Sequence, residues 1–576
     1  MHLAESLKAK IGCGAPEPSL LIPEKIAVER WIAAGLFVLS CAYLLAFRRY
    51  VTMDPDEGIV LQGAERILNG EILYRDFFSF FTPGSYCWQA ALLKLFGNSL
   101  IVARTALVLY GGLFTVFTYF IARRTSPRWI ALTAAYLATI ACLPWRFMVL
   151  HNWDSTVSFC LAVYFAVRFV EAPRLRWAVA VGTFSSLTFL FEQSKGAGLI
   201  LGLLLGFCLL AWLKLKTPQP LWTIPNIFGL AAGFAWPAIL AVTYFAAHHA
   251  VSAFLADIAW PLHHYAPANE VPYGWADWSD QTRQALFHSG DPIQAVVAFV
   301  AVIPCFIFPA LPLIACFLLI STVIAAGCFQ IPADRASHYC VVGSTVAGAL
   351  FSILIVRPNI VHFVYLAPLL FVSLGWLMDG RDVFPLMQRS IRPLAVAIVL
   401  VTFTCAGMAL LIANQDSRSI LETRRGLVRT PGPDELLPYL QAHVLPSEKI
   451  FVYPYFPLAY FLADTANPTR YEYLQPGLHT REQDLEAIRE LEAARTRVVL
   501  FEPSFYDKVA TSWPNTPLST FAADPVADFI LRKYHPCANL ASGNASISAG
   551  GSTRFSFMMR DGVPCPPENQ TAQARN

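Results

Sequence analysis

The sequence predicts an α-helical polytopic membrane protein with about 11 to 13 transmembrane helices and a small C-terminal α/β domain outside the membrane. Three observations lead to this fold class. Hydrophobic residues make up 56% of the chain and charged residues only 14%, whereas soluble domains carry about a quarter charged residues. Apolar runs long enough to cross the hydrocarbon core recur through residues 31–413, and residues 414–576 have an ordinary soluble composition.

The same composition excludes several classes of protein. A disordered chain, a disulfide-rich secreted module and an ordinary cytosolic enzyme are all less apolar than this sequence. The 42 basic and 39 acidic residues leave a net charge of +3, which is too balanced for a protein that binds nucleic acid. We therefore expect the lipid bilayer, and no nucleic acid, among its partners.

The spans can be placed by length and apolarity. Residues 1–30 lack the pattern of a cleaved signal peptide, so the first apolar run should remain as an anchor. The apolar stretch 291–329 is interrupted by Pro304, Pro309 and Pro312 and crosses either once or three times. The other predicted spans lie near 31–47, 99–122, 129–147, 154–170, 177–192, 196–213, 222–246, 340–356, 361–378 and 393–413.

Short loops rich in Lys and Arg remain on the cytoplasmic side. Such loops are found before the first span, after the second, between the fourth and fifth, after the sixth and before the last. This places residues 1–30 inside, and it places the loops 48–98 and 247–290 outside together with the domain 414–576. Loop 48–98 is too apolar to be fully solvated, and its helical patterns at 57–69 and 84–96 indicate interfacial helices.

The C-terminal domain shows alternating strand and helix patterns. Lys449–Tyr453 and Arg497–Phe501 are predicted strands, and Glu482–Ala494 is a predicted amphipathic helix. Cys537 and Cys565 lie in this domain, where an oxidising compartment allows a disulfide; the sequence leaves paired and free cysteines as equal alternatives.

Ionisable residues near a membrane are candidates for function, because burying them is costly unless they are paired or solvated. Asp54, Asp56 and Glu57 follow the first span, and three carboxylates so close together favour a shared cation or proton. The alternative is a solvated turn in which Asp56 caps the following helix.

A second group, Arg75 and Asp76, lies in an aromatic stretch of the same outside loop. A guanidinium suits a phosphate, and aromatic rings suit an isoprenoid tail or a sugar face.

Three further groups lie at predicted outer ends of spans. They are Asp154, Lys195 beside Glu192, and the pair Arg357 and His362 around the helix-breaking Pro358. Their structural alternatives are a helix cap, a local ion pair and membrane anchors. All of the groups share the outer face under the predicted topology, which indicates one site at the membrane boundary.

The outside loop 247–290 contains His248, His249, His263 and His264, with Trp260, Trp275 and Trp278. A metal site is disfavoured, because the histidines come as adjacent pairs whose rings point apart on a helix and no orienting carboxylate is evident. We expect an aromatic loop that packs against a sugar or a lipid.

The order of these motifs resembles a known superfamily. An early helix is followed by an outside loop with the acidic pair Asp56-Glu57, then by the element Gly70–Phe77 (G-x-x-x-Y-R-D-F) and by Pro83–Tyr86 (P-G-S-Y). The late segment Arg357–His362 matches an Arg-x-x-x-x-His pattern. Together they resemble the GT-C polytopic glycosyltransferases, which include dolichyl-phosphate-mannose–protein mannosyltransferases and the bacterial transferase that adds aminoarabinose to lipid A. Residues 54–213 carry the clearest match.

The resemblance implies a membrane glycosyltransferase with a polyprenyl-phosphate sugar donor, an active site at the outer face and inversion at the anomeric carbon. The family's loop base maps to Asp56, with Glu57 beside it and Asp54 competing for the role. The second acidic position maps to Asp154. Phosphate contacts are expected from Arg75, Lys195, Arg357 or His362.

Some members bind a divalent cation such as Mg²⁺ or Mn²⁺, which Asp54, Asp56 and Asp154 could hold, and others do without. The acceptor could be a lipid, a glycan or a protein, and the bacterial relatives suggest the inner membrane with a periplasmic active site.

Two other functions compete with this interpretation. A secondary transporter or lipid flippase usually places charges at the bilayer midplane, whereas here they gather at one face. A non-catalytic scaffold gives no reason for three carboxylates beside the first helix.

Overall fold

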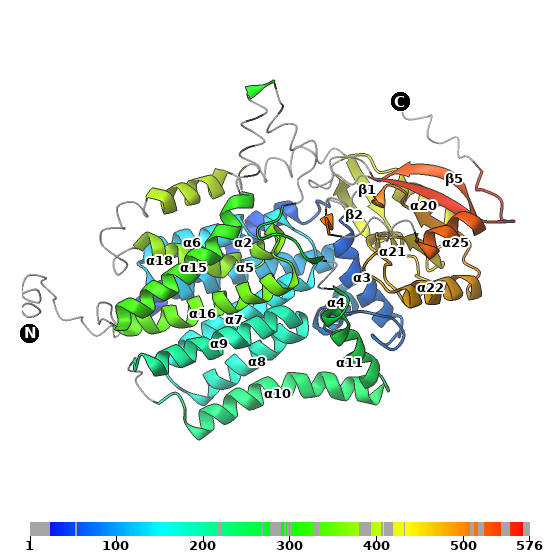
Figure 1. Cartoon of the computed structure of the whole chain (residues 1–576). Coiled ribbons are helices and arrows are strands. Elements are labelled where there is room, and N and C mark those ends of the chain that lie inside the picture. The colour runs from blue at the N-terminus through cyan, green and yellow to red at the C-terminus, as the bar shows by residue number, and fades with distance from the viewer. Residues whose placement is uncertain are drawn as a thin grey trace, which may run out of the picture.

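We describe the chain from a computed structural model (Figure 1). It describes residues 23–567 apart from 52–53, 216–219, 266–268, most of 277–303, 328–332, 380–392, most of 405–418, 431, 507–511, 516–522 and 543–552. A bundle of long helices forms one part of the molecule, and an α/β domain is attached at one end of this bundle (Figure 1).

The bundle follows the predicted order of spans. Its helices are α2 (Pro23–Leu44), α5 (Leu100–Thr125), α6 (Arg128–Ile140), α7 (His151–Glu171), α8 (Leu175–Phe191), α9 (Gln193–Trp212), α10 (Ile224–Ala247), α15 (Pro304–Gly327), α16 (Ala333–Val356), α17 (Ile360–Val364) and α18 (Ala367–Asp379). Within the described residues, seven helices are long and apolar enough to cross a membrane, and four shorter apolar helices accompany them. The polytopic α-helical fold class is therefore confirmed.

Small residues allow a close helix contact in the bundle. Helix α9 packs on α16, where a Cβ at Gly198 would lie 2.6 Å from the carbonyl oxygen of Gly348 and a Cβ at Gly202 would lie 2.5 Å from that of Ser344. Side chains larger than hydrogen would separate the two backbones. This is how small residues at four-residue spacing bring membrane helices together.

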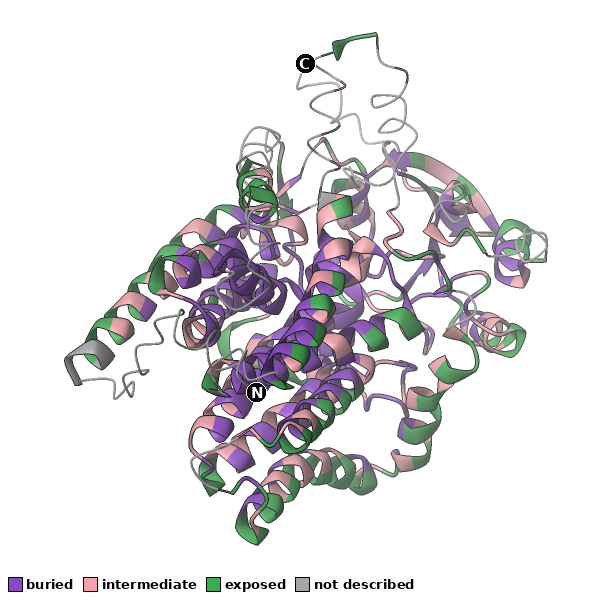
Figure 2. Cartoon of the chain, turned by 60° about the vertical axis from the view of Figure 1, so that its left-hand side comes forward, coloured by how far each residue is buried: buried purple, intermediate pink, exposed green. Residues whose placement is uncertain are grey.

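Residues in the middle of the bundle are buried and many on its outside are exposed (Figure 2). The exposed residues include many large apolar ones. Helix α10 is the extreme case, since Ile224 and Phe228 are 84% and 70% exposed. Such a surface is unfavourable in water and favourable in lipid. The burial pattern supports an integral membrane protein.

Two predicted boundaries are wrong. Pro309 and Pro312 do not interrupt the stretch 291–329, because both lie inside the continuous helix α15. Neighbouring groups in an apolar bundle can satisfy the backbone that proline leaves free, which lets a membrane helix continue through proline. The Tyr273 hydroxyl also donates to the carbonyl of Pro309 at 2.6 Å. The span predicted at 129–147 ends as helix α6 at Ile140, before a short 3₁₀ turn (η2, Leu143–Trp145) that contains Pro144.

The two ends of the bundle differ in their chemistry. At one end, Arg124 and Arg168 pair with Glu171 at 3.0 and 2.5 Å, and Arg335 pairs with Asp379 at 2.5 Å. At the other end lie the helices of the loop 48–98, α3 (Pro55–Leu68) and α4 (Gly84–Phe96), which confirm the two helices predicted there. Basic residues that the topology assigns to the inside thus gather at the end opposite to the loop.

Part of the loop 247–290, which the sequence predicts to lie outside, is also helical. It contains α11 (Val251–Ala259) and the 3₁₀ turn η3 (Trp260–Leu262). The Trp260 ring stacks on Phe80 with centroids 5.3 Å apart, and it contacts the rings of His264 and His479. Trp278 lies outside the described residues.

The C-terminal domain begins with the hairpin β1 (Ser419–Thr423) and β2 (Gly426–Thr430). A four-stranded sheet follows in the order β3-β4-β6-β5, with β3 (Ile450–Tyr453) parallel to β4 (Val498–Phe501) and with β6 (Arg554–Arg560) and β5 (Tyr534–Ala541) antiparallel. Its helices are α20 (Leu436–His443), α21 (Leu458–Ala463), α22 (Arg481–Ala493) and α25 (Pro525–Lys533). The predicted strands and helix are confirmed as β3, β4 and α22.

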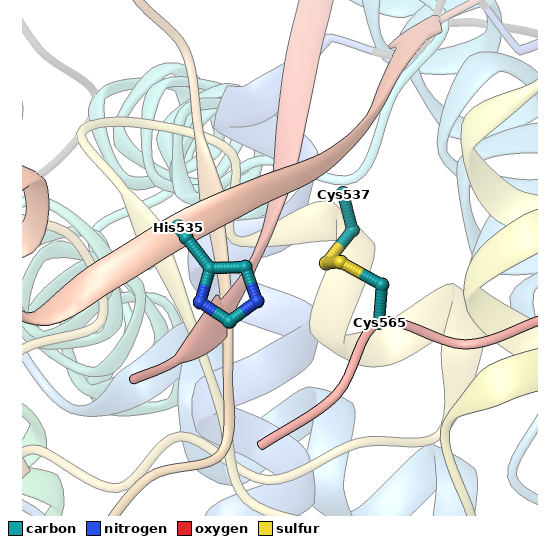
Figure 3. Close-up of side chains that lie close together, drawn as sticks. All are labelled: His535, Cys537 and Cys565. Carbon is teal, nitrogen blue, oxygen red and sulfur yellow. A yellow bond between two sulfur atoms is a disulfide. The ribbon is translucent and has the colours of Figure 1, made fainter. Parts of the chain in front are cut away.

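Cys537 and Cys565 form a disulfide that ties β5 to the segment after β6 (Figure 3). His535 lies beside it, and these three residues are the one group of potential metal ligands found within the described part of the chain. Since both sulfur atoms belong to the disulfide, the group is not a metal site.

Candidate active site

Asp54 and Asp56 lie at the N-terminus of α3, which is located between the bundle and the C-terminal domain (Figure 1). Pro55 stands at the first helical position, and Oδ1 of Asp54 caps the helix by accepting from the backbone N–H of Asp56 at 3.0 Å. The sequence had suggested Asp56 as the cap. Because Asp54 takes this role, the carboxylate of Asp56 is left for other contacts.

Arg146 binds both carboxylates with one nitrogen. Its Nη2 donates to Oδ2 of Asp54 at 3.3 Å and to Oδ2 of Asp56 at 3.0 Å. The phenol of Tyr455, from the C-terminal domain, donates to Oδ1 of Asp56. Two acids that would repel each other are thus held together by one guanidinium.

The two carboxyl groups differ in accessibility. The side chain of Asp56 is 39% exposed and that of Asp54 is 25% exposed. Burial, with the nearby charge of Asp56, raises the pKa of Asp54 to about 6. Asp56 is therefore the carboxylate that an approaching substrate reaches more easily.

Glu57 points away from this pair. Its carboxylate accepts from Nε and Nη2 of Arg104 at 2.9 and 2.6 Å, and from the backbone N–H of Val149 at 2.9 Å. Both side chains of the ion pair are 1% exposed. The bidentate pair fixes α3 on α5.

Lys195 forms a second charged cluster at the start of α9. Its Nζ lies 2.9 Å from Oε2 of Glu192 and donates to the carbonyl of Asn152 at 2.9 Å and to Oγ of Ser155 at 2.8 Å. The predicted local ion pair of Lys195 and Glu192 is present. It also binds the first turn of α7, so it joins two predicted groups.

A small cavity of about 10 Å³ lies beside Lys195. His362 faces it, and Nδ1 of His362 lies 2.6 Å from Oδ1 of Asn359, which also caps α17. The other walls come mainly from the apolar helix α16; the lining consists of Glu192, Ser194, Lys195, Ala349, Ser352, Ile353, Val356, His362, Tyr365 and Leu366. A cation and an apolar wall meet here at the end of the bundle.

Tyr365 connects this cavity to the aspartate pair. Its ring lies 5.5 Å from Nζ of Lys195, and it packs edge-on against Trp153 with centroids 4.7 Å apart. The indole of Trp153 donates to the carbonyl of Arg146 at 2.9 Å. The lysine cluster and the arginine that binds Asp54 and Asp56 are therefore neighbours across two aromatic rings.

The side chains of three further predicted groups bind other partners. Arg75 and Asp76 form an exposed ion pair at 2.8 Å, and Oδ2 of Asp76 accepts from the backbone N–H of Ile72 to close the turn. Asp154 is buried in α7, where it accepts from the hydroxyl of Tyr110 at 2.7 Å.

Arg357, the third group, reaches the C-terminal domain. It donates to Oδ1 of Asn269 at 3.0 Å and to the carbonyl of Ser512, and its guanidinium lies over the ring of Trp513. It therefore joins the loop 247–290 to that domain.

A divalent cation does not fit the three predicted ligands as they stand. Asp54 and Asp56 already share the positive charge of Arg146, and Asp154 is engaged by Tyr110 elsewhere. No group of three acidic, histidine or cysteine ligands that includes these aspartates converges within the described residues.

Sequence reasoning missed Arg146 and Tyr455. Arg146 fell at the end of a predicted span, where a basic residue is usually an anchor, although its position between two apolar segments is a signal that could have marked it. Tyr455 follows a strand of the C-terminal domain and is 399 positions from Asp56 in the sequence. No local pattern could have identified that contact.

Residues 82–247 match the family model described as dolichyl-phosphate-mannose-protein mannosyltransferase. No curated protein matches the chain significantly.

Among solved structures, the chain is similar to the Archaeoglobus fulgidus oligosaccharyltransferase tethered to an acceptor peptide, with a TM-score of 0.42, 11% identity, and coverage of 91% of this chain and 74% of that one. It is also similar to ArnT from Cupriavidus metallidurans, with a TM-score of 0.43 and 15% identity. The match covers 84% of this chain and 95% of the ArnT chain. A third similar structure is AglB of A. fulgidus in complex with an inhibitory peptide and a dolichol-phosphate, with a TM-score of 0.40 and 11% identity. The match covers 93% of this chain and 75% of the AglB chain.

Proposed function

The family match supports a membrane glycosyltransferase of the GT-C type, and on that premise we propose that the chain moves a sugar from a polyprenyl-phosphate donor to an acceptor hydroxyl. The reaction takes place at the outer face of the membrane and inverts the anomeric carbon. The hydroxyl belongs to a lipid, a glycan or a protein.

One observation carries the proposal. An accessible carboxylate, Asp56, and a buried lysine, Lys195, belong to neighbouring clusters joined through the rings of Tyr365 and Trp153, and the lysine is next to an apolar helix. A base for an alcohol and a cation for a lipid phosphate are the two groups that this transfer requires.

The chemistry follows from that pair. Asp56 takes the proton of the acceptor hydroxyl, whose oxygen forms the new bond to the anomeric carbon as the bond to the phosphate oxygen breaks. The polyprenyl phosphate leaves with the bonding electrons, and the positive charge of Lys195 stabilises it. Attack from the side opposite to the phosphate gives inversion.

The other predicted residues have supporting roles in this proposal. Asp54 competes with Asp56 for the role of the base, but Asp56 is favoured because its side chain is more exposed. His362 faces the cavity beside Lys195, where it can contact the phosphate. Arg75, Asp76, Asp154 and Arg357 remain proposed substrate contacts, although their present partners also give each of them a structural role.

The proposal also includes the orientation of the protein in the membrane. Basic residues at the opposite end of the bundle support a cytoplasmic position for that end. The carboxylates and the C-terminal domain then face the periplasm of a bacterial inner membrane.

Replacement of Asp56 tests the role of the base. Asp56→Asn keeps the size of the side chain and its contact with Tyr455 but removes the basic oxygen, so we expect the rate of sugar transfer to fall by about 100-fold or more. The measurement is transfer from a radiolabelled polyprenyl-phosphate sugar in membranes. Asp528→Asn, a change at an exposed position on α25, is the matched control and should leave the rate unchanged.

A deletion strain tests the function itself. Loss of the enzyme should cause the lipid-linked sugar donor to accumulate, which mass spectrometry of extracted lipids detects. An unchanged lipid profile together with full activity of Asp56→Asn would contradict the proposal and favour a transporter or a scaffold.

A further inference from the structure

We infer that the C-terminal domain completes the active site and that Tyr455 is the residue that positions Asp56. This inference rests on the proposed function, because it assigns a role to a contact of the proposed base. It gives the domain a part in the transfer reaction itself.

The contact is direct. The phenol of Tyr455 donates to Oδ1 of Asp56, while Arg146 binds Oδ2 of the same carboxylate. With one partner on each oxygen, the plane of the carboxylate is fixed. A base that is held in one orientation presents its free lone pairs to the acceptor hydroxyl without a search among rotamers.

The position of Tyr455 follows from the fold of the domain. It comes two residues after β3, at the carboxyl end of the parallel pair β3–β4, which is the edge where sheets of this kind commonly place functional side chains. Its ring packs edge-on against Tyr473, with centroids 4.7 Å apart. The phenol is therefore supported from within the domain.

The domain is also fixed on the helix that carries Asp56. A Cβ at Gly58 would lie 1.9 Å from the backbone nitrogen of Leu458, so α3 and the start of α21 touch backbone to backbone. Further along α3, Nη1 of Arg66 donates to the carbonyl of Thr469 at 3.0 Å.

Arg425 adds a charged link, because it pairs with Glu65 of α3 and with Asp464 of the domain at 2.7 Å. These contacts along α3 hold the C-terminal domain in place, so that Tyr455 stays within hydrogen-bonding distance of Asp56.

Tyr455→Phe tests the inference, because it removes the hydroxyl and keeps the ring. We expect kcat to fall about 10- to 100-fold, since a small displacement of a reacting group is enough for such a loss. The KM for the donor should stay within about twofold, because the phosphate contacts are not changed. The assay uses a defined polyprenyl-phosphate sugar and the full-length protein in detergent or nanodiscs.

The matched control is Tyr471→Phe. Tyr471 also donates its phenol to a carboxylate in the same domain, but that carboxylate is Glu486 and not Asp56. A structural effect of losing such a bond would appear in both variants, whereas the inference expects the loss of kcat in Tyr455→Phe alone. The thermal unfolding temperatures of the two variants should be similar.

Two outcomes overturn the inference. One is a wild-type kcat for Tyr455→Phe, and the other is an equal loss of kcat in both variants. If either occurs while Asp56→Asn is inactive, the positioning role fails and the proposed function stands. If Asp56→Asn is fully active, the proposed function fails as well.

Discussion

Asp56 and Glu57 are neighbours in the sequence, and the helix turns them toward different surroundings. Asp56 meets Arg146 and Tyr455 at an accessible edge, whereas Glu57 meets Arg104 in the interior. The sequence predicted a functional cluster of acids at this place but could not divide the roles, because side-chain direction depends on where α3 begins. That start is set by Asp54 and Pro55.

Glu57→Gln tests the division of roles. It leaves the guanidinium of Arg104 buried without a countercharge, so we expect the protein to lose about 3 to 5 kcal/mol of stability. Thermal unfolding of the purified variant, followed by intrinsic fluorescence, measures this loss, and Asp56→Asn provides the comparison with little change expected. A Glu57→Gln protein of normal stability without activity would instead support a catalytic role for Glu57.

The acidity of Asp54 predicts a pH dependence. Since burial and the charge of Asp56 raise its pKa to about 6, Asp54 is ionised above that pH and takes up a proton as the pH falls through it. Protonation removes one of the two anions that hold Arg146, so the rate of transfer should decline below about pH 6. Asp54→Asn should lack this step in its pH–rate profile, and a variant that keeps the same step would show that another group titrates.

At the scale of elements, apolar length and periodicity predicted most helices and the two strands β3 and β4, because these signals are local. The helix boundaries were less certain where proline lay near a span. Helix α15 continues through two prolines, and α6 ends well before the predicted limit, which places Arg146 in a turn rather than in a span. That turn lets the guanidinium reach the N-terminus of α3.

The contact between α3 and α21 predicts a severe effect of a small substitution. Gly58→Ala places a methyl group against the backbone at Leu458, which cannot move as a side chain can. We expect the C-terminal domain to separate from α3, with faster limited proteolysis of the domain and loss of transfer activity. Gly35→Ala, in a helix where a Cβ meets no atom within 4 Å, is the control that should behave as wild type. Equal protease resistance in the two variants would contradict the tight packing.

At the scale of the whole molecule, the distribution of charge along the sequence predicted that five polar groups share one end of the bundle. The structure brings two of them, around Asp56 and Lys195, into neighbouring clusters, and it places ion pairs of basic residues at the opposite end. Hydropathy predicts which end a loop occupies but not which loops meet there. The C-terminal domain illustrates this, since its strands β3 and β4 were predicted and its packing on α3 was not.

The link between Asp56 and Tyr455 has a consequence for biosynthesis. The two residues are 399 positions apart, and every membrane helix of the bundle is encoded between α3 and the C-terminal domain except α2. The whole bundle and the first part of the last domain, as far as Tyr455, must therefore be synthesised before the hydrogen bond can form. A chain that is released before residue 455 would contain Asp54 and Asp56 but not Tyr455. The contact between Tyr455 and Asp56 therefore forms only in chains that have been synthesised beyond residue 455.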